Sequence, residues 1–230
     1  SDSAYSRGVS ILFRKELDAQ ILNTHKSEDA RTVLVNVTLN DEILSFVSIY
    51  APNSDNARIP FFNRLKTFIT CNIPQESKVF LCGDFNCCME KKNDKSSKRL
   101  LEILNQLDFK DLWHFKNPHK DGRTWCDSEN TPKSRIDYIS AKNINLNQIK
   151  TFVVRHVPGT HNNNTRMSDH RYLKICANFN TLERGSGYWK LNISHLEKED
   201  YNEGINSIFN QLDDSLDATS KWELFKVKVR

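Results

Sequence analysis

The segment Val79–Asn86 (VFLCGDFN) runs four apolar residues directly into a turn that carries an acid and an amide. Such a short apolar run is typical of a strand that is buried on both faces. Asp84 and Asn86 lie two residues apart, so their side chains can face the same side. The carboxylate can orient or deprotonate a water molecule, and the amide can stabilise charge on a phosphoryl oxygen. The alternative is an ordinary turn in which Asp84 only caps the following backbone.

Two more predicted strand ends carry polar groups. The strand predicted over residues 43–49 leads into Tyr50, whose phenol can donate a hydrogen bond to a phosphate, although aromatic residues at strand ends are common. Asp169 and His170 come just before an apolar stretch at residues 172–177. They can supply a metal-binding carboxylate and an imidazole. A lone His in this position is more often structural than catalytic, so its interpretation depends on a partner elsewhere in the chain.

Asp137 is that candidate partner, because it lies inside a strand-like run between Ile136 and Tyr138. A carboxylate in this position would need a partner if it were buried. Carboxylates commonly hold an imidazole in one tautomer, so we expect Asp137 to orient His170. Acids, amides and one His delivered from strand ends indicate a divalent metal site that activates water. The pattern therefore predicts hydrolysis of a phosphate ester.

The hydrophobic pattern of the remaining chain predicts a mixed, layered α/β fold. Helical spacing is found around residues 61–69 and 100–107, and Asn40-Asp41 is a hairpin signal between two strands. Strands outnumber helices, and hairpins mix with crossovers, which favours a mixed sheet over a purely parallel one. The predicted strands cover residues 8–13, 32–39, 43–49, 79–82, 123–126, 135–139, 151–157 and 172–179.

The character of the chain changes after about residue 182. Residues 184–187 (RGSG) form a linker, and a polar, helix-like tail follows from residue 195 to residue 230. We therefore predict one domain over residues 1–182, and a linker with a helical tail over residues 183–230.

The composition is typical of a globular protein, and its net positive charge permits a nucleic-acid partner. The chain is 38% hydrophobic and 27% charged, with a net charge of +4. No stretch approaches the roughly 18 apolar residues that a membrane span needs, and no signal peptide is recognisable. The six Cys contain no C-x-x-C pair, so we expect reduced thiols and a nuclear or cytoplasmic protein that is not secreted.

A basic segment closely follows the Asp84 turn. It is expected either to contact phosphates of a nucleic acid or to form a plain solvated loop, and its position beside the suspected site favours the phosphate contact. Its basic residues are Lys91, Lys92, Lys95, Lys98 and Arg99.

Four motifs, in their order and spacing, resemble the endonuclease/exonuclease/phosphatase superfamily, which includes the apurinic endonucleases, DNase I and the phosphoinositide phosphatases. The motifs are residues 48–53 (SIYAPN), 83–86 (GDFN), 134–139 (SRIDYI) and 168–170 (SDH). Within that superfamily the chain resembles the endonuclease domain of non-LTR (LINE-type) retrotransposon polyproteins. Residues 184–192 and 221–230 resemble segments that lead from this domain toward a reverse transcriptase, whose own motifs are absent here.

The resemblance implies a DNase I-like, four-layer α/β sandwich that hydrolyses a phosphodiester of DNA with Mg²⁺, or with Mn²⁺ as the alternative ion. It also implies a role for each candidate residue. His170 would stabilise or protonate at the scissile phosphate, with Asp137 orienting it, and Asp84 would orient the attacking water. Asn86 would steady the phosphate charge, Asp169 would sit by the metal, Tyr50 would contact the phosphate, and Thr124 would lie near the nucleic acid.

One departure from the family pattern lowers the expected activity. Family members begin with a strand that carries an Asn, followed by a strand that ends in a metal-binding Glu. Neither is recognised before residues 8–13, so we expect an N-terminally truncated domain with an incomplete metal site. Three functions remain open: a DNA-nicking endonuclease that works beside a reverse transcriptase domain in the full-length polyprotein, a phosphoinositide or phospholipid phosphoesterase, and an inactive remnant that folds or binds nucleic acid. We expect no membrane partner.

Overall fold

The computed structural model describes residues 8–91, 93–129, 131–156, 168–178, 199–212 and 215–228. The chain divides into two compact units, residues 1–179 and residues 180–230, which are described separately. The predicted boundary at residues 182–183 and the basic residue Lys92 lie outside the described residues.

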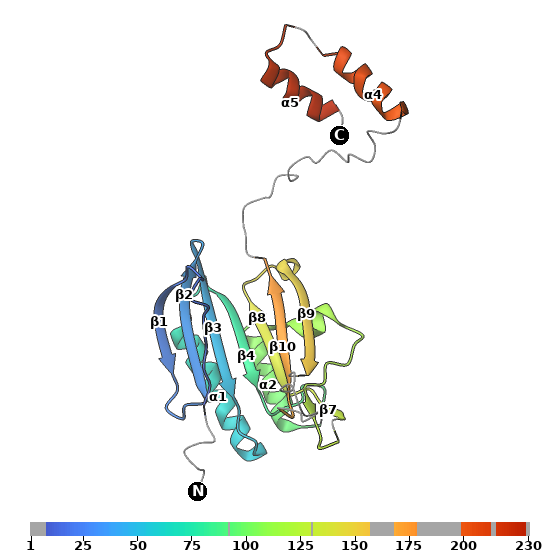
Figure 1. The fold of residues 1–230 in the computed structure, drawn as a ribbon. Helices are drawn as coiled ribbons and strands as arrows, with labels where there is room; N and C mark the ends of the chain where they lie inside the picture. The colour runs from blue at the N-terminus through green and yellow to red at the C-terminus, as the bar shows by residue number, and fades with distance from the viewer. Residues whose placement is uncertain are drawn as a thin grey trace. The chain divides into compact units, whose positions relative to one another are not determined.

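A six-stranded mixed sheet forms the centre of the first unit (Figure 1). Only β3 and β4 pair in parallel, while every other neighbouring pair in this sheet is antiparallel. In spatial order its strands are β1 (Gln20–Lys26), β2 (Thr32–Leu39), β3 (Glu42–Tyr50), β4 (Lys78–Asp84), β8 (Asp137–Lys142) and β5 (Lys110–Asp111). The mixed sheet predicted from the sequence is confirmed.

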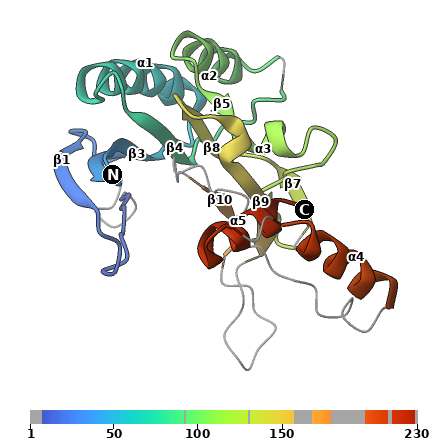
Figure 2. The same ribbon diagram turned by 90° about the horizontal axis from the view of Figure 1, so that it is seen from above.

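Two smaller antiparallel pairs accompany this sheet. Strands β9 (Ile149–His156) and β10 (Arg171–Ala177) form one pair, and β6 (Trp125–Cys126) and β7 (Pro132–Ser134) form the other. Seen from above, β9 and β10 lie on one side of the large sheet, and the two long helices cover its other face (Figure 2). The described part of this unit therefore has three layers, where the resemblance implied four.

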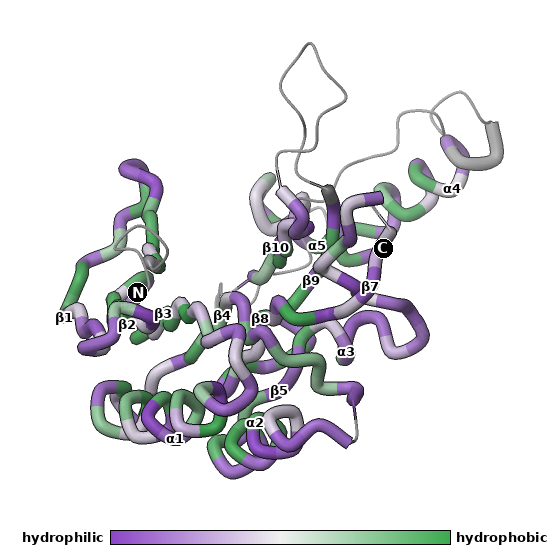
Figure 3. Tube along the Cα trace, turned by 90° about the horizontal axis from the view of Figure 1, so that it is seen from below, coloured by the Kyte–Doolittle hydropathy of each residue, from purple (hydrophilic) through white to green (hydrophobic). Residues whose placement is uncertain are grey.

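The helices of the first unit are α1 (Asp55–Asn72), α2 (Lys95–Gln106) and the short α3 (Leu112–Lys116), with a 3-10 turn at Leu146–Gln148. Figure 3 shows hydrophobic and hydrophilic residues alternating along the turns of α1 and α2. The apolar face packs on the large sheet, where Phe61, Phe62 and Leu100 are fully buried. A second apolar cluster, which includes Phe80 and Phe152, fills the opposite face of the sheet.

The N-terminal part of the chain differs from the prediction. Residues 8–13 form no strand, although the side chains of Ile11 and Phe13 pack against the second cluster and give the segment its apolar pattern. The Phe13 ring meets the edge of Phe46 at 5.7 Å between centroids. Strand β1 (QILNTHK) was not predicted, because it is an exposed edge strand that lacks a regular hydrophobic alternation. The hairpin signal at Asn40 and Asp41 is confirmed, and both residues have the positive φ that such turns require.

The second unit contains two helices, α4 (Glu199–Asn210) and α5 (Ala218–Lys228). The aromatic ring of Phe225 stacks on Trp222 and meets the edge of Phe209, which joins the two helices. Among the described helices of the chain, none combines the length and the apolar character that crossing a bilayer requires.

Candidate active site

Strand register gathers three of the predicted site residues in one row. Tyr50 at the end of β3 is the register partner of Asp84 at the end of β4, and Asp84 is the register partner of Asp137 at the start of β8. Register partners on neighbouring strands point to the same face of a sheet. The parallel pairing of β3 with β4 is extended by a hydrogen bond from the Ala51 amide to the Asp84 carbonyl at 2.8 Å.

Gly83 allows β4 to place Asp84 in this row. Its φ is +138°, a region that residues with a side chain rarely occupy. A Cβ at this position would lie 2.0 Å from the carbonyl oxygen of Ile49 on β3. Glycine is therefore required here by both the backbone conformation and the close approach of the neighbouring strand.

Asn86 donates hydrogen bonds to both oxygens of the Asp84 carboxylate. Its backbone N–H donates to one carboxylate oxygen at 2.8 Å, and its side-chain Nδ2 donates to the other at 3.1 Å. The same Nδ2 also donates to the Ala51 carbonyl at 2.8 Å. Both amide hydrogens of Asn86 are therefore engaged. The geometry favours a role in holding Asp84 over the direct phosphate contact expected from the sequence.

His170 approaches the row from the start of β10. Its Nδ1 lies 2.8 Å from Oδ2 of Asp137, which is the pairing that the two motifs suggested. The imidazole is 31% exposed and the carboxylate 16% exposed, so the pair is partly shielded from water. The main chain beside His170 is fixed through a β-bridge to Trp125 and a hydrogen bond from the Cys126 amide to the Asp169 carbonyl at 2.8 Å.

Thr124 lies inside the protein, which corrects the prediction of a nucleic-acid contact there. The residue is fully buried. Its Oγ1 accepts hydrogen bonds from the backbone amides of Ile136 and Asp137 at 3.2 and 3.1 Å. A side chain held in this way cannot reach a bound nucleic acid. Thr124 instead fixes the backbone that presents Asp137 to His170.

Asp169 lies next to His170 and is exposed, and its Oδ2 accepts a hydrogen bond from Trp125 Nε1 at 3.0 Å. The cluster of acids has an electrostatic consequence. Burial, followed by the charge of Asp137, raises the pKa of Asp84 to about 6, and Asp169 adds to this effect. The hydrogen bond with Asp137 raises the pKa of His170 against the opposing effect of burial.

The residues present fit a divalent cation. One ligand atom from each of Asp84, Asp137 and His170 lies within 4.8 Å of the others. Asp137 and Asp169 raise the pKa of Asp84 because the carboxylates repel one another, and a cation among them would relieve this repulsion. Carboxylate oxygens suit Mg²⁺ and Mn²⁺, and an imidazole suits transition metals.

Comparison with known proteins agrees with this geometry. The sequence profile described as Endonuclease/Exonuclease/phosphatase family matches residues 1–170. The chain belongs to this family. It is also 22% identical, over 238 aligned residues, to a Xenopus laevis protein named "Transposon TX1 uncharacterized 149 kDa protein". That alignment covers 98% of this chain, whereas the chain spans only 18% of the length of the Xenopus protein.

Solved structures of similar fold include an AP endonuclease from Archaeoglobus fulgidus, with a TM-score of 0.56 and 16% identity over 69% of this chain and 71% of that chain. Another is the 3' phosphatase NExo from Neisseria, solved bound to a product DNA hairpin, with a TM-score of 0.57 and 16% identity over 70% of this chain and 72% of that chain. At this identity the likeness shows the fold alone: this family member has the mixed α/β fold of the DNase I-like AP endonucleases.

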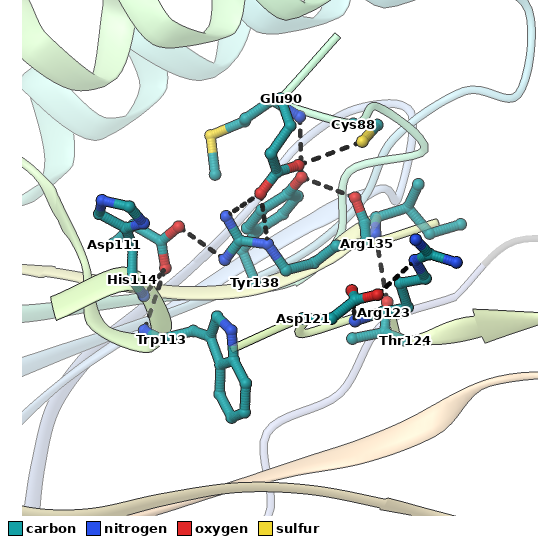
Figure 4. Close-up of polar contacts among 12 residues, drawn as sticks. Cys88, Glu90, Asp111, Trp113, His114, Asp121, Arg123, Thr124, Arg135 and Tyr138 are labelled. Atoms are coloured by element: carbon teal, nitrogen blue, oxygen red, sulfur yellow. Dashed lines mark hydrogen bonds and ion pairs between the residues drawn. The ribbon is translucent and has the colours of Figure 1, made fainter. Parts of the chain in front are cut away.

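A buried arginine that the motif analysis passed over ties the site elements of this family member together. Figure 4 shows the guanidinium of Arg135 between the carboxylates of Glu90 and Asp111. Its Nη1 lies 2.6 Å from Asp111, and its Nε donates to Glu90 at 2.7 Å. The Tyr138 hydroxyl donates to the Arg135 carbonyl at 2.7 Å and accepts from the Met89 amide at 2.9 Å. The turn after Asn86 is thus joined to the start of β8.

The predicted basic residues do not all behave alike. Arg99 on α2 is engaged with Asn63 of α1 at 2.8 Å and with Glu102 at 2.9 Å, so its guanidinium serves mainly to join the two helices. Three lysines remain exposed around the start of α2 and present their charge to solvent: Lys91, Lys95 and Lys98.

Proposed function

We propose that this chain is a metal-dependent phosphodiesterase that nicks DNA and forms the endonuclease part of a transposon-encoded protein. The observation that carries the proposal is the row of Tyr50, Asp84 and Asp137 at neighbouring strand ends, with His170 paired to it from the second sheet. Family membership supports a phosphate ester as substrate. The DNA in the NExo structure and the transposon origin of the Xenopus relative support DNA.

Asp84 orients and activates the attacking water. Without a cation, burial and the neighbouring Asp137 raise its pKa to about 6, which makes this carboxylate a stronger base than an exposed Asp. Two donors from Asn86 fix its direction, so the water is held in one place before reaction. We accordingly assign Asn86 to positioning Asp84.

His170 acts on the phosphate from the Asp137 end of the row. With Nδ1 donating to the Asp137 carboxylate, its Nε2 is the nitrogen left to meet the substrate. The raised pKa keeps the imidazole protonated to higher pH, so Nε2–H can donate to a phosphoryl oxygen or protonate the leaving oxygen. Tyr50 contacts the phosphate from the β3 end of the row.

A divalent cation would be held by Asp169, as the resemblance implies, next to the acidic cluster that Asp84 and Asp137 form. Mg²⁺ or Mn²⁺ suits these oxygen ligands. When bound, the ion would polarise a phosphoryl oxygen and neutralise the charge that accumulates there.

DNA approaches with its backbone along the exposed lysines that follow Asn86, because each lysine can replace a counterion at a phosphate. We propose that a reverse transcriptase domain accompanies this one in the full-length polyprotein, as the resemblance implies. A nuclear or cytoplasmic location follows from such a role.

Nicking of supercoiled plasmid, with Mg²⁺ or Mn²⁺ and an EDTA control, tests the proposal. We expect Asp84→Ala and His170→Ala each to lower the rate by about 10² to 10⁴-fold, the range for loss of a general acid or base. Asp18→Ala and His119→Ala, exposed residues of the same types, serve as matched controls. Equal nicking by all four variants would refute the site. DNA binding without nicking would indicate an inactive remnant, and phosphate release from a phosphoinositide would indicate a phosphoesterase.

A further inference from the structure

Arg58 is a buried arginine on the otherwise apolar inner side of α1, with only 9% of its surface exposed. Its guanidinium joins three polar partners. Nη1 donates to the carbonyl of Asn53 at 3.3 Å and also donates to the carbonyl of Asn86. Nη2 pairs with the Asp55 carboxylate in the first turn of α1. Arg58 thus contacts the segments that follow β3 and β4, but none of the four residues that form the row and its His partner.

Asn86, whose carbonyl accepts from Arg58, has an uncommon backbone conformation. Asn86 has a φ of +47°, in the left-handed region that residues other than glycine seldom adopt. Such conformations persist only where surrounding contacts determine them. On one side, the backbone N–H and Nδ2 of Asn86 donate to the two oxygens of Asp84. On the other side, its carbonyl accepts from Arg58.

We propose that Arg58 is a positioning residue for Asp84, which it controls through Asn86. This inference rests on the proposed function, because it concerns the carboxylate that orients water. By bonding to both the Asn53 and the Asn86 carbonyl, the guanidinium fixes the loop after Tyr50 against the loop after Asp84. A planar fork with several donors suits this task, whereas a lysine ammonium offers no comparable geometry.

The test compares Arg58→Met, which keeps an unbranched stem in the core, with Arg64→Met as matched control. Arg64 lies on the same helix, but its side chain is 63% exposed, and its guanidinium pairs with Asp29. We expect Arg58→Met to lower kcat by up to about 10²-fold, the effect of a misplacement near 1 Å, with KM for DNA unchanged. Arg64→Met should retain both values.

Hydrogen exchange of the Asn86 backbone amide, followed by NMR, gives a readout that needs no activity. Loss of a charge-assisted bond to its carbonyl should speed this exchange by about tenfold or more in Arg58→Met relative to Arg64→Met. If the wild-type chain fails to nick DNA, the proposed function is refuted, while the exchange rate still decides the role of Arg58.

Other outcomes would overturn the inference. One is an Asn86 exchange rate equal to that of Arg64→Met, and another is a raised KM with unchanged kcat, which would place Arg58 in substrate binding. Should Arg58→Met fail to fold, Arg58→Lys is measured in its place. A lysine that restored full kcat and normal exchange would refute the need for a fork that bridges two carbonyls.

Discussion

Replacing Asp84 with Asn is expected to stabilise the protein near neutral pH while removing hydrolysis. Burial and the charge of Asp137 raise the pKa of Asp84 from 3.8 to about 6 in the folded protein. The folded state therefore holds this proton more tightly than the unfolded state. As pH rises through this interval the unfolded chain releases its proton first, so the free energy of unfolding falls. The loss amounts to about 3 kcal/mol, at 1.36 kcal/mol per pKa unit.

An amide at this position carries no charge, so the penalty disappears. The substitution also turns one acceptor of an Asn86 hydrogen bond into a donor, which costs about 1 kcal/mol. We therefore expect Asp84→Asn to gain about 2 kcal/mol above pH 6, or roughly 4–8 °C in Tm for a domain of this size. Toward pH 4 the gain should vanish, since Asp84 is then protonated in the folded state and increasingly so in the unfolded state.

Urea unfolding of both proteins without divalent metal, between about pH 4 and about pH 8, measures this difference. Asp108→Asn removes the same charge from an exposed position and serves as control. A constant difference between Asp84→Asn and wild type across the whole range would refute the reasoning. So would destabilisation by Asp84→Asn at neutral pH, because it would mean that Asp84 is held more favourably as a carboxylate than as an amide.

Three further predictions address the site. Gly83→Ala should cost about 3 kcal/mol or more in chemical unfolding, because its Cβ would strike the Ile49 carbonyl, whereas Gly8→Ala, with nothing within 4 Å, should have little effect. Asp137→Asn should reduce nicking less than His170→Ala and should move the alkaline loss of activity to lower pH, since the pKa of His170 falls; the pH–rate profiles of both variants decide this. Neutralising the exposed Lys91, Lys95 and Lys98 should flatten the salt dependence of DNA binding. The log–log slope should change by about 0.9 for each DNA phosphate that a lysine no longer neutralises, and an unchanged slope would mean that these lysines form a plain solvated surface.

Hydrophobic patterning predicted the centre of the fold and missed its margins. Strands β2 and β3 are rich in β-branched and aromatic residues and are joined by a recognisable turn, so both their extent and their pairing followed from the sequence. Strand β1 sits at the edge, where backbone pairing rather than side-chain burial holds it, so it left no periodic signal. Residues 8–13 gave the opposite error, because Phe13 packs on Phe46 although the backbone around it is unpaired.

Motifs indicated which residues meet at the site but not how they are held. The proximity of Asp137 to His170 followed from the chemistry of the two side chains. The register that aligns Asp84 with both Tyr50 and Asp137 arises from pairings between distant segments, which local patterns cannot specify. Arg58 had no visible signal, since it reads as a charge on a helix. Thr124 was predicted near the nucleic acid, and only the structure shows that it is buried and supports the backbone of Asp137.

The arrangement of the site explains why its supports are mostly polar and buried. The cluster of Asp84, Asp137 and Asp169 is costly to assemble, because neighbouring carboxylates repel one another where they are partly shielded from water. Without fixed partners, Asp84 could turn away from Asp137 and relieve that repulsion. Asn86, itself gripped by Arg58, prevents this movement on one side of the row, while the Asp137 backbone is fixed by Thr124 on the other. The strain is thereby kept where a cation and a phosphate would relieve it, which ties the stability of the apo protein to ligand binding.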